Sequence, residues 1–312
     1  MNKTFKGAFT ALVTPMKENG AVDYDGFRAL VARQIDEGID GLVPLGTTGE
    51  TPTLEDGEEE QLIRIAVEAT AGRVPLIVGA GSNSTPHMEG YVKRARDLGA
   101  DAVLVVTPYY NKPNDSGLIG HFERAAAAGI PVIIYNIAGR TGRNIPAALM
   151  NKLADIPGIA GVKEASGDIN QIMEVIEKIA LPRKDRGAPF WVLSGDDSLT
   201  LPLMALGGDG VVSVISNLVP RRIKALTAAC LAGNYEEARR LHYELLPLVQ
   251  HAFIETNPVP VKVAMNRAAL AGTSLPAGPV RPPLGPLAPE NRAKLFAVLE
   301  HAGLIQGPAD ST

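Results

Sequence analysis

Eight short apolar segments recur along the first 220 or so residues, and helix-like segments separate them. Most of the eight lack polar alternation, as expected for strands that are covered on both faces of a parallel sheet. They span residues 8–14, 41–45, 75–80, 102–106, 131–135, 159–163, 190–194 and 210–214. Apolar residues at helical spacing follow at residues 24–37, 57–70, 85–98, 117–128, 146–153 and 169–179. This alternation predicts a (β/α)8 barrel, and the first strand lacks the glycine-rich turn of a doubly wound sheet.

The strand pattern stops after residue 220, and only helix-like segments follow. These segments span residues 221–232, 235–251, 259–271 and 289–301. A proline-rich stretch at residues 275–287 separates the last two and is expected to run extended over the surface. We therefore predict two parts, a catalytic barrel at residues 1–225 and a small C-terminal helical domain at residues 226–312.

Composition argues against several classes of partner. The net charge is −4 with both signs interspersed, so no nucleic-acid footprint is visible. No apolar segment approaches the ~20 residues of a membrane span, and the run at residues 8–13 is short for a secretory signal. The single cysteine, Cys230, cannot form an internal disulfide and is expected to be a small buried residue of a helix. A cytoplasmic protein without nucleic-acid or membrane partners is expected.

A lysine closes the sixth predicted strand. Lys163 follows the apolar run at residues 158–162 and precedes Glu164. Poor hydration at such a position favours the neutral amine. A neutral amine is a nucleophile that forms Schiff bases with carbonyl compounds. A lone lysine at a strand end more often extends to solvent or pairs with a carboxylate such as Glu164.

Other polar residues follow the predicted strands and should share one rim of the barrel with Lys163. Tyr135 ends the fifth strand, and a phenol beside an amine can shuttle protons, although an ordinary rim tyrosine is equally expected. Thr47 and Thr48 lie between glycines and could seat a carboxylate, although the same pattern caps helices. Arg140 could clamp a second carboxylate or lie in an exposed loop.

Signals for other chemistries are weak in this sequence. No Walker sequence or Gly-x-Ser-x-Gly elbow occurs, and residues 79–81 match only part of a dinucleotide fingerprint. The five histidines have no metal-ligand spacing. Asp196 and Asp197 are expected to cap a helix. Amine catalysis without a metal or a cofactor is therefore the chemistry that this rim supports.

The motifs together resemble the pyruvate-dependent class I lyases typified by N-acetylneuraminate lyase, and most closely the branch of dihydrodipicolinate synthases. They are Gly-Thr-Thr-Gly-Glu at 46–50, Tyr-Tyr-Asn-Lys-Pro at 109–113, Tyr-Asn at 135–136, Arg-Thr-Gly at 140–142 and Gly-Val-Lys-Glu-Ala at 161–165. Further motifs at residues 194–197, 210–214 and 257–262 extend the likeness over nearly the whole chain.

The resemblance implies a role for each matching residue. Lys163 would form an imine with pyruvate, and Tyr135 would move protons along the imine–enamine path. Thr47 and Tyr110 would complete the proton relay. In the family this second tyrosine comes from a neighbouring subunit, which implies a homotetramer built as a dimer of dimers.

The resemblance also implies binding residues. Thr48, with Thr47, would seat the pyruvate carboxylate, and Arg140 would hold the carboxylate of aspartate semialdehyde. Backbone groups at Gly195 and Val212 would line the pocket. In the loop before Arg140, residues 138 and 139 are Ala and Gly where proline and serine are expected.

Many members of the family are inhibited by lysine at a subunit interface. By resemblance, Asn83, Tyr109 and Glu59 could serve such a site here. His87 stands where sensitive members tend to carry a carboxylate. The response to lysine therefore stays open.

The expected function is a lyase that condenses pyruvate with L-aspartate 4-semialdehyde in lysine and diaminopimelate synthesis. One alternative is a sister aldolase that cleaves a sialic acid or a keto-deoxy sugar acid, in which serine is more usual at Thr48 and Arg140 is usually absent. Another alternative is a non-catalytic barrel that senses a keto acid. The intact set of Thr47, Tyr110 and Tyr135 argues against a sensor.

Overall fold

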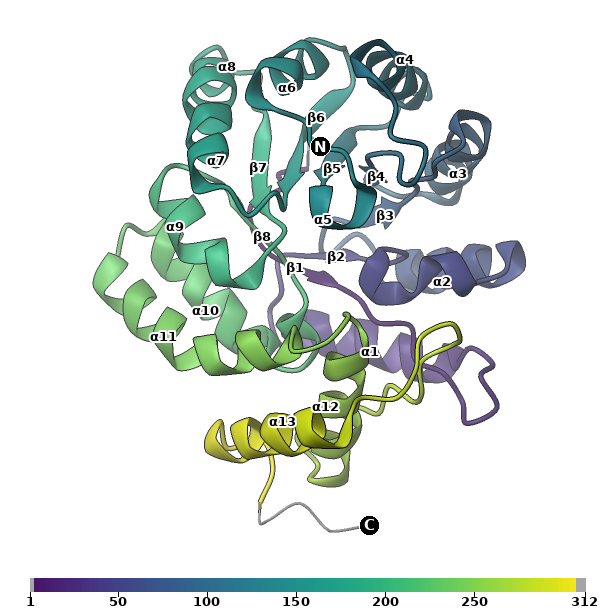
Figure 1. The fold of residues 1–312 in the computed structure, drawn as a ribbon, viewed down its shortest axis with the longest axis vertical. Helices are drawn as coiled ribbons and strands as arrows, with labels where there is room; N and C mark the ends of the chain where they lie inside the picture. The colour runs from purple at the N-terminus through teal and green to yellow at the C-terminus, as the bar shows by residue number, and fades with distance from the viewer. Residues whose placement is uncertain (1–2, 307–312) are drawn as a thin grey trace.

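The computed structural model describes residues 3–306. Within these residues, parallel strands form one sheet in the order β2-β1-β8-β7-β6-β5-β4-β3. The strands are β1 (Gly7–Ala11), β2 (Gly41–Val43), β3 (Ile77–Gly79), β4 (Ala102–Val106), β5 (Val132–Asn136), β6 (Ile159–Glu164), β7 (Trp191–Ser194) and β8 (Gly210–Ser213). A parallel bridge between Leu42 and Leu76 joins β2 to β3 and closes the sheet. The predicted (β/α)8 barrel is confirmed (Figure 1).

Helices surround the sheet and cover its outer face (Figure 1). They are α1 (Tyr24–Asp36), α2 (Asp56–Thr70), α3 (Thr85–Leu98), α4 (Asp115–Ala126), α6 (Ala147–Ala154), α7 (Ile169–Val175), α8 (Leu181–Asp185), α9 (Thr200–Ala205) and α10 (Pro220–Leu231). In α1, the buried residues Phe27, Leu30, Val31 and Gln34 recur at helical spacing, and the side chain of Asp23 caps the first turn. Such stripes explain why the helical segments could be read from the sequence.

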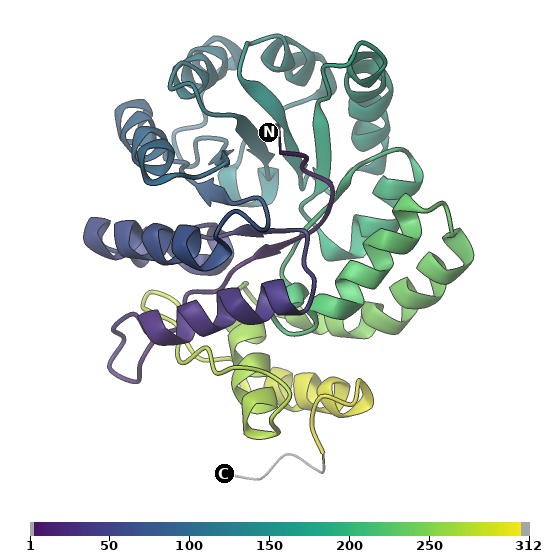
Figure 2. The ribbon, with the colours of Figure 1, turned by 180° about the vertical axis from the view of Figure 1, so that it is seen from behind.

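A separate apolar cluster fills the interior of the barrel and includes Phe5 and Trp191 at the mouth where the strands begin. Phe5 packs against Phe9 and Trp191, with ring centroids 6.4 Å apart in both pairs. The segment before β1 crosses this mouth (Figure 2). The opposite mouth, at the carboxyl ends of the strands, is where the polar residues predicted for the site lie.

The C-terminal part consists of α11 (Tyr235–Ala252), α12 (Val259–Leu270) and α13 (Pro289–His301). Residues 275–287 contain no helix or strand, as expected for the proline-rich stretch. Cys230 is buried in α10, also as expected. The predicted boundary between residues 225 and 226 falls inside α10, and this helix packs both on β1 of the barrel and on α11. The division into two domains stays a prediction.

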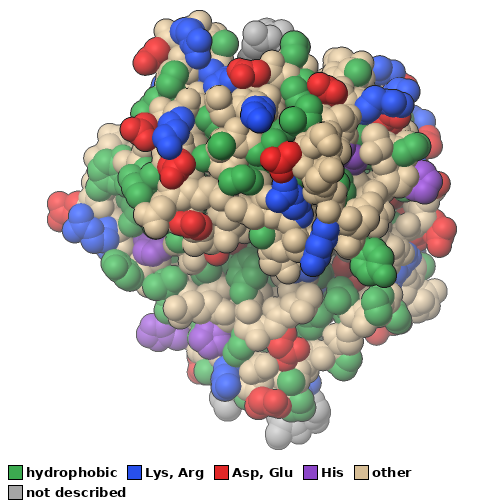
Figure 3. Space-filling model, turned by 45° about the horizontal axis from the view of Figure 1, so that its top comes forward, with side chains coloured by type: hydrophobic (Ala, Val, Ile, Leu, Met, Phe, Trp, Pro, Cys, Tyr) green, Lys and Arg blue, Asp and Glu red, His purple; other side chains and the backbone are tan. Residues whose placement is uncertain are grey.

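Charged side chains of both signs are interspersed on the face shown in Figure 3. On α2 and α11, oppositely charged side chains pair across one helical turn, as Arg64 does with Glu60 (2.6 Å) and Arg240 with Glu244 (2.9 Å). In the part of the chain that the structure describes, no helix has both the length and the apolar character needed to cross a membrane.

Candidate active site

Lys163 and Tyr135 are partners in the register between β6 and β5. Both side chains are buried, each 5% exposed. Lys163 Nζ lies 4.2 Å from the centroid of the Tyr135 ring. Side chains at paired positions of adjacent strands point to the same face of a sheet. The structure thus places the amine beside the phenol, as the order of the strands predicts.

Gly195, in the turn that follows β7, leaves space for the side chain of Lys163. A Cβ atom at Gly195 would lie 3.1 Å from Lys163 Cε and 2.7 Å from the Cβ of Ala165. Contacts that short require a neighbouring atom to move. The absence of a side chain at Gly195 therefore allows the aliphatic stem of Lys163 to take its observed position.

Glu164, the next residue on β6, lies on the outer face of the sheet and does not pair with Lys163. Its buried carboxylate accepts hydrogen bonds from Asn136 Nδ2 (3.1 Å), Gln171 Nε2 (3.3 Å) and the Ser166 N–H (2.7 Å). Asn136 Oδ1 in turn accepts from the Ile145 N–H (3.0 Å). This network ties the ends of β5 and β6 to the loop that follows Arg140.

A cavity of about 570 Å³ opens at this rim of the barrel. Thr47, Tyr135 and Arg140 line it together with the residues considered for lysine binding, which are Glu59, Asn83, His87 and Tyr109. Lys163, Thr48, Gly195 and Val212 are not among its lining residues. The Val212 side chain belongs to the apolar cluster inside the barrel, which also contains Tyr135.

The two threonines of the first motif have different environments. Residues Thr47–Gly49 form one 3-10 turn. The Thr47 side chain faces the cavity, whereas the buried Thr48 Oγ1 accepts a hydrogen bond from Asn257 Nδ2 (3.0 Å). The sequence did not single out Asn257, although it begins the motif at residues 257–262. A residue just before α12 thus holds the turn at the rim.

Arg140 lies on a helical turn that was predicted as a loop. This turn, α5 (Ala138–Thr141), ends at Gly142, whose φ is 70°. Arg140 Nη2 donates a hydrogen bond to the Asn257 carbonyl (3.2 Å). Asn257 therefore contacts both Thr48 and Arg140, which are two of the three residues expected to bind carboxylates.

Tyr110 does not reach the cavity of its own chain. Its side chain is 90% exposed, and its φ of 71° is unusual for a non-glycine residue. The preceding residue, Tyr109, lines the cavity. Of the four residues expected to be catalytic, one chain brings together only Lys163, Tyr135 and Thr47.

The wall of the cavity carries a carboxyl group with a shifted pKa. Burial raises the pKa of Glu59 to about 7, and the nearby charge of Asp56 adds to this rise. The Arg94 guanidinium opposes it, because Arg94 and Glu59 form an ion pair. Glu59 is therefore already engaged by a cation in the free protein.

Asp196 and Asp197 behave differently, although both were expected to cap a helix. Asp196 does cap the turn after β7, where it accepts from the Ser198 N–H (2.8 Å). The prediction for Asp197 was wrong, because its side chain is buried and accepts from the Val214 N–H (2.8 Å). Asp197 thereby joins the turn after β7 to the end of β8. Within residues 3–306, no group of His, Cys, Asp and Glu could hold a metal ion.

Burial raises the pKa of Asp197 to about 6, against the hydrogen bonds from Ser213 and Val214. Because the folded state holds this proton more tightly than the unfolded state, ionisation destabilises the fold as the pH rises from about 4 to about 6. An Asp197→Asn variant lacks this loss. Between about pH 4 and pH 6, we expect the free energy of unfolding of the variant, relative to that of the wild type, to increase by about 2 kcal/mol. Urea unfolding at several pH values measures the gain.

An Asp196→Asn variant is the control for this prediction. Its side chain caps the same turn but is not fully buried. Its stability should keep most of the wild-type dependence on pH, because the substitution removes only the smaller contribution of the Asp196 charge to the raised pKa of Asp197 and leaves the burial unchanged. If the stability of Asp197→Asn also runs parallel to the wild type between pH 4 and 7, the buried carboxyl is not the group responsible.

Comparison with known proteins finds members of one enzyme family that match this chain over nearly its whole length. Residues 4–302 match the sequence model of the dihydrodipicolinate synthetase family. The 4-hydroxy-tetrahydrodipicolinate synthase of Maridesulfovibrio salexigens is 47% identical over 304 residues, which cover 97% of this chain and 100% of that protein.

Solved structures of dihydrodipicolinate synthases have the same fold as this chain. Dihydrodipicolinate synthase from Aquifex aeolicus superposes with a TM-score of 0.90 at 43% identity and covers 96% of this chain and 99% of that one. The enzyme from Cyanidioschyzon merolae with lysine bound has a TM-score of 0.87 at 40% identity, with the same coverage of 96% and 99%. The chain therefore belongs to the dihydrodipicolinate synthetase family.

Proposed function

We propose that the protein condenses pyruvate with L-aspartate 4-semialdehyde to 4-hydroxy-tetrahydrodipicolinate, in lysine and diaminopimelate synthesis. The observation that carries this proposal is the Lys163 amine 4.2 Å from the Tyr135 ring at the rim of the barrel. Relatives that are up to 47% identical carry the name of this activity. The reaction needs no cofactor, because the imine nitrogen itself accepts electrons.

The first half of the reaction captures pyruvate. The neutral amine of Lys163 adds to the ketone carbon of pyruvate and forms a carbinolamine. Its hydroxyl takes up a proton and leaves as water, so that a positively charged iminium ion remains. The positive nitrogen makes a proton of the adjacent methyl group acidic. Tyr135, beside the amine, is placed to move protons during these steps. Loss of the methyl proton gives an enamine.

The second half forms the carbon–carbon bond and releases the lysine. The enamine carbon attacks the aldehyde carbon of the second substrate, and the aldehyde oxygen takes up a proton. The amine of that substrate then adds to the iminium carbon and displaces Lys163. The ring closes, and the net reaction releases one water.

The binding roles follow from the positions at the rim. The turn with Thr47 and Thr48 is proposed to seat the pyruvate carboxylate through its hydroxyl and N–H groups. Arg140, which lines the cavity, is proposed to bind the carboxylate of the aldehyde substrate. Gly195 and Val212 are proposed to contribute backbone groups below the cavity.

The proton relay is proposed to be completed by Tyr110 from a second subunit. Tyr110 is 90% exposed and lies outside its own cavity, so it is free to enter the site of a neighbour. We propose a homotetramer built as a dimer of dimers. The lone buried cysteine supports a reducing compartment, and we propose the cytoplasm.

Trapping and turnover together test the proposed function. Treatment with pyruvate and borohydride should reduce the imine and leave a modified Lys163 peptide. The protein should consume pyruvate only when aspartate semialdehyde is present. Turnover of a sialic acid or of a keto-deoxy sugar acid instead would replace this function by that of a sister aldolase. Binding of pyruvate with no turnover of any aldehyde would support a sensor.

Lysine is proposed to act in the same cavity, at the part of its wall formed by Glu59, Asn83 and Tyr109. The carboxylate of Glu59 already pairs with Arg94, so a ligand ammonium must compete with that ion pair. His87 lies where a second carboxylate would help. We therefore expect weak inhibition, measured as turnover with and without lysine. Strong inhibition at low lysine concentration would contradict this expectation.

A Gly195→Ala variant should slow imine formation. The new methyl group would lie 2.7 Å from the Ala165 Cβ and 3.1 Å from Lys163 Cε, so the end of β6 must shift and the lysine amine shifts with it. A displacement of about 1 Å costs roughly 100-fold in rate, and we expect a loss of 10- to 100-fold in the rate of borohydride trapping. Gly120→Ala in α4 is the control, because nothing lies within 4 Å of its added methyl group. An unchanged rate in Gly195→Ala would contradict the packing argument.

A further inference from the structure

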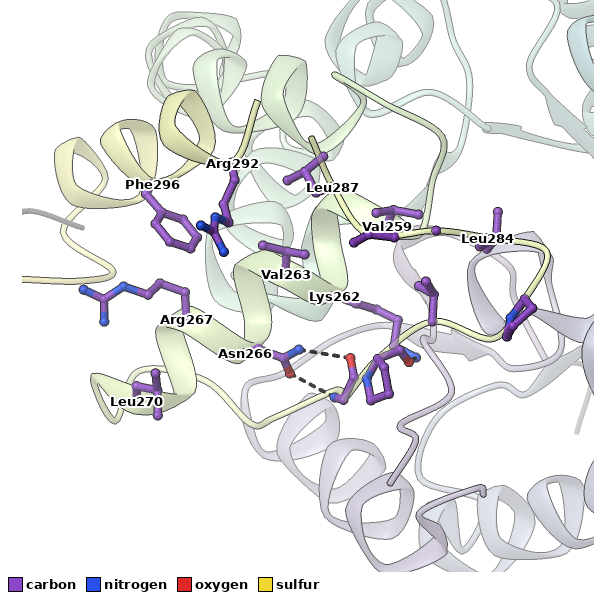
Figure 4. A pocket seen from close by; sticks show the side chains of 16 residues that line it. Val259, Lys262, Val263, Asn266, Arg267, Leu270, Leu284, Leu287, Arg292 and Phe296 are labelled. Atoms are coloured by element: carbon purple, nitrogen blue, oxygen red, sulfur yellow. Dashed lines mark hydrogen bonds between the residues drawn. The ribbon is translucent and has the colours of Figure 1, made fainter. Parts of the chain in front are cut away.

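Lys262 is a buried cation that the proposed reaction does not use. Its side chain is 1% exposed and projects from α12 toward the proline-rich segment, residues 275–287 (Figure 4). Nζ donates hydrogen bonds to Glu50 Oε1 (2.7 Å), the Pro279 carbonyl (2.6 Å) and the Thr14 carbonyl (3.0 Å). These bonds use all three donors of the ammonium group, so the charge is held in one place.

The acceptor Glu50 is the last residue of the motif that contains Thr47 and Thr48. Its side chain is fully buried, and its second oxygen accepts from the Arg281 N–H (2.8 Å). Its φ is 57°, a left-handed conformation that costs energy for a residue with a side chain. Such a conformation persists only where the surroundings hold it. Here the C-terminal part of the chain holds it from two sides.

The conformation of Glu50 shapes the turn before it. The Glu50 N–H donates to the Thr47 carbonyl (3.1 Å), which closes the turn. The Gly49 carbonyl accepts from Thr14 Oγ1 (2.7 Å), and the carbonyl of Thr14 is bound by Lys262. The ammonium of Lys262 thus fixes the turn by two routes, one through Glu50 and one through Thr14.

We infer that Lys262 and Glu50 form a positioning pair, which makes the seat for the pyruvate carboxylate depend on the docking of the C-terminal segment. The inference rests on the proposed function of Thr47, Thr48 and Lys163. Both members of the pair are buried away from substrate, so they act through the turn. Loss of the pair should weaken pyruvate binding and leave the imine chemistry of Lys163 intact.

A second ion pair attaches the same segment and offers a matched control. Arg281 Nη1 and Nη2 contact the Glu58 carboxylate at 2.7 and 2.6 Å. Glu58 lies on α2, outside the turn. A Glu58→Gln variant therefore weakens the attachment of the segment without removing either member of the positioning pair.

The experiment measures borohydride trapping over a range of pyruvate concentrations. It compares the wild type with Lys262→Met, Glu50→Gln/Lys262→Met and Glu58→Gln. The double variant is included because Lys262→Met alone leaves a buried carboxylate unpaired and can fail to fold. In the double variant we expect the half-saturating pyruvate concentration to rise about tenfold or more. The maximal trapping rate should stay within about threefold, and Glu58→Gln should stay within about twofold of the wild type in both values.

An unchanged half-saturating pyruvate concentration in the folded double variant would overturn the inference. The pair would then only stabilise the fold, and its loss would lower Tm without weakening pyruvate binding. An equal rise in Glu58→Gln would also overturn it, since general loosening of the segment would then explain the effect. If the wild-type protein is not trapped at all, the proposed function itself is overturned, and the role of the pair with it.

Discussion

A Lys163→Met variant is expected to lose condensation activity by at least about 10⁴-fold, because no other group takes the place of the nucleophile. Methionine fills a similar volume but cannot form an imine. Lys163 is 5% exposed, so an apolar replacement should not destabilise the barrel. The measurements are kcat with both substrates and the mass of the peptides after treatment with pyruvate and borohydride. Tm of the variant should stay close to that of the wild type.

A surface lysine provides the control for this loss. Lys178 is largely exposed and pairs with Glu174 across one helical turn. Lys178→Met should keep its activity and its trapping at Lys163. Trapping that persists in Lys163→Met, on any other lysine, would show that the amine at the end of β6 is not the reacting group.

The barrel could be predicted from the sequence because its strands and helices each leave a pattern within a short stretch of chain. Strands covered on both faces are continuous apolar runs, and the eight runs are separated by helices with a buried stripe. The order of the strands then placed Tyr135 next to Lys163, which the register confirms. Strand ends were less well predicted: β1 ends at Ala11 rather than at residue 14, because burial continues beyond the paired backbone.

Features built from distant residues could not be predicted in this way. Glu50 and Lys262 are 212 residues apart, and neither has a local pattern that names its partner. The turn α5 has no apolar periodicity, and its Arg140 bonds the carbonyl of Asn257 (3.2 Å), which lies 117 residues away in the chain. The different environments of Thr47 and Thr48 likewise depend on Asn257. The sequence therefore predicts candidate residues for the site, whereas long-range contacts decide how those residues are held.

A Tyr110→Phe variant is the second change with a large expected effect. Loss of one hydroxyl from a proton relay should lower kcat by about 10²- to 10⁴-fold. Stability should hardly change, because the side chain is 90% exposed in the single chain. Tyr243→Phe, at another exposed tyrosine (64%), should retain full activity and is the control. Steady-state kinetics of the two variants give the comparison.

Mixing of two inactive variants separates a relay within one chain from one between chains. In a dimer of one Tyr110→Phe subunit and one Lys163→Met subunit, the first barrel keeps Lys163 and Tyr135 and receives an intact Tyr110 from the second. Random reassociation of equal amounts makes about half of the dimers mixed, each with one complete site out of two. About one quarter of wild-type activity should therefore return after joint unfolding and refolding. If Tyr110 served its own chain, every site in the mixture would lack one group, and no activity would return.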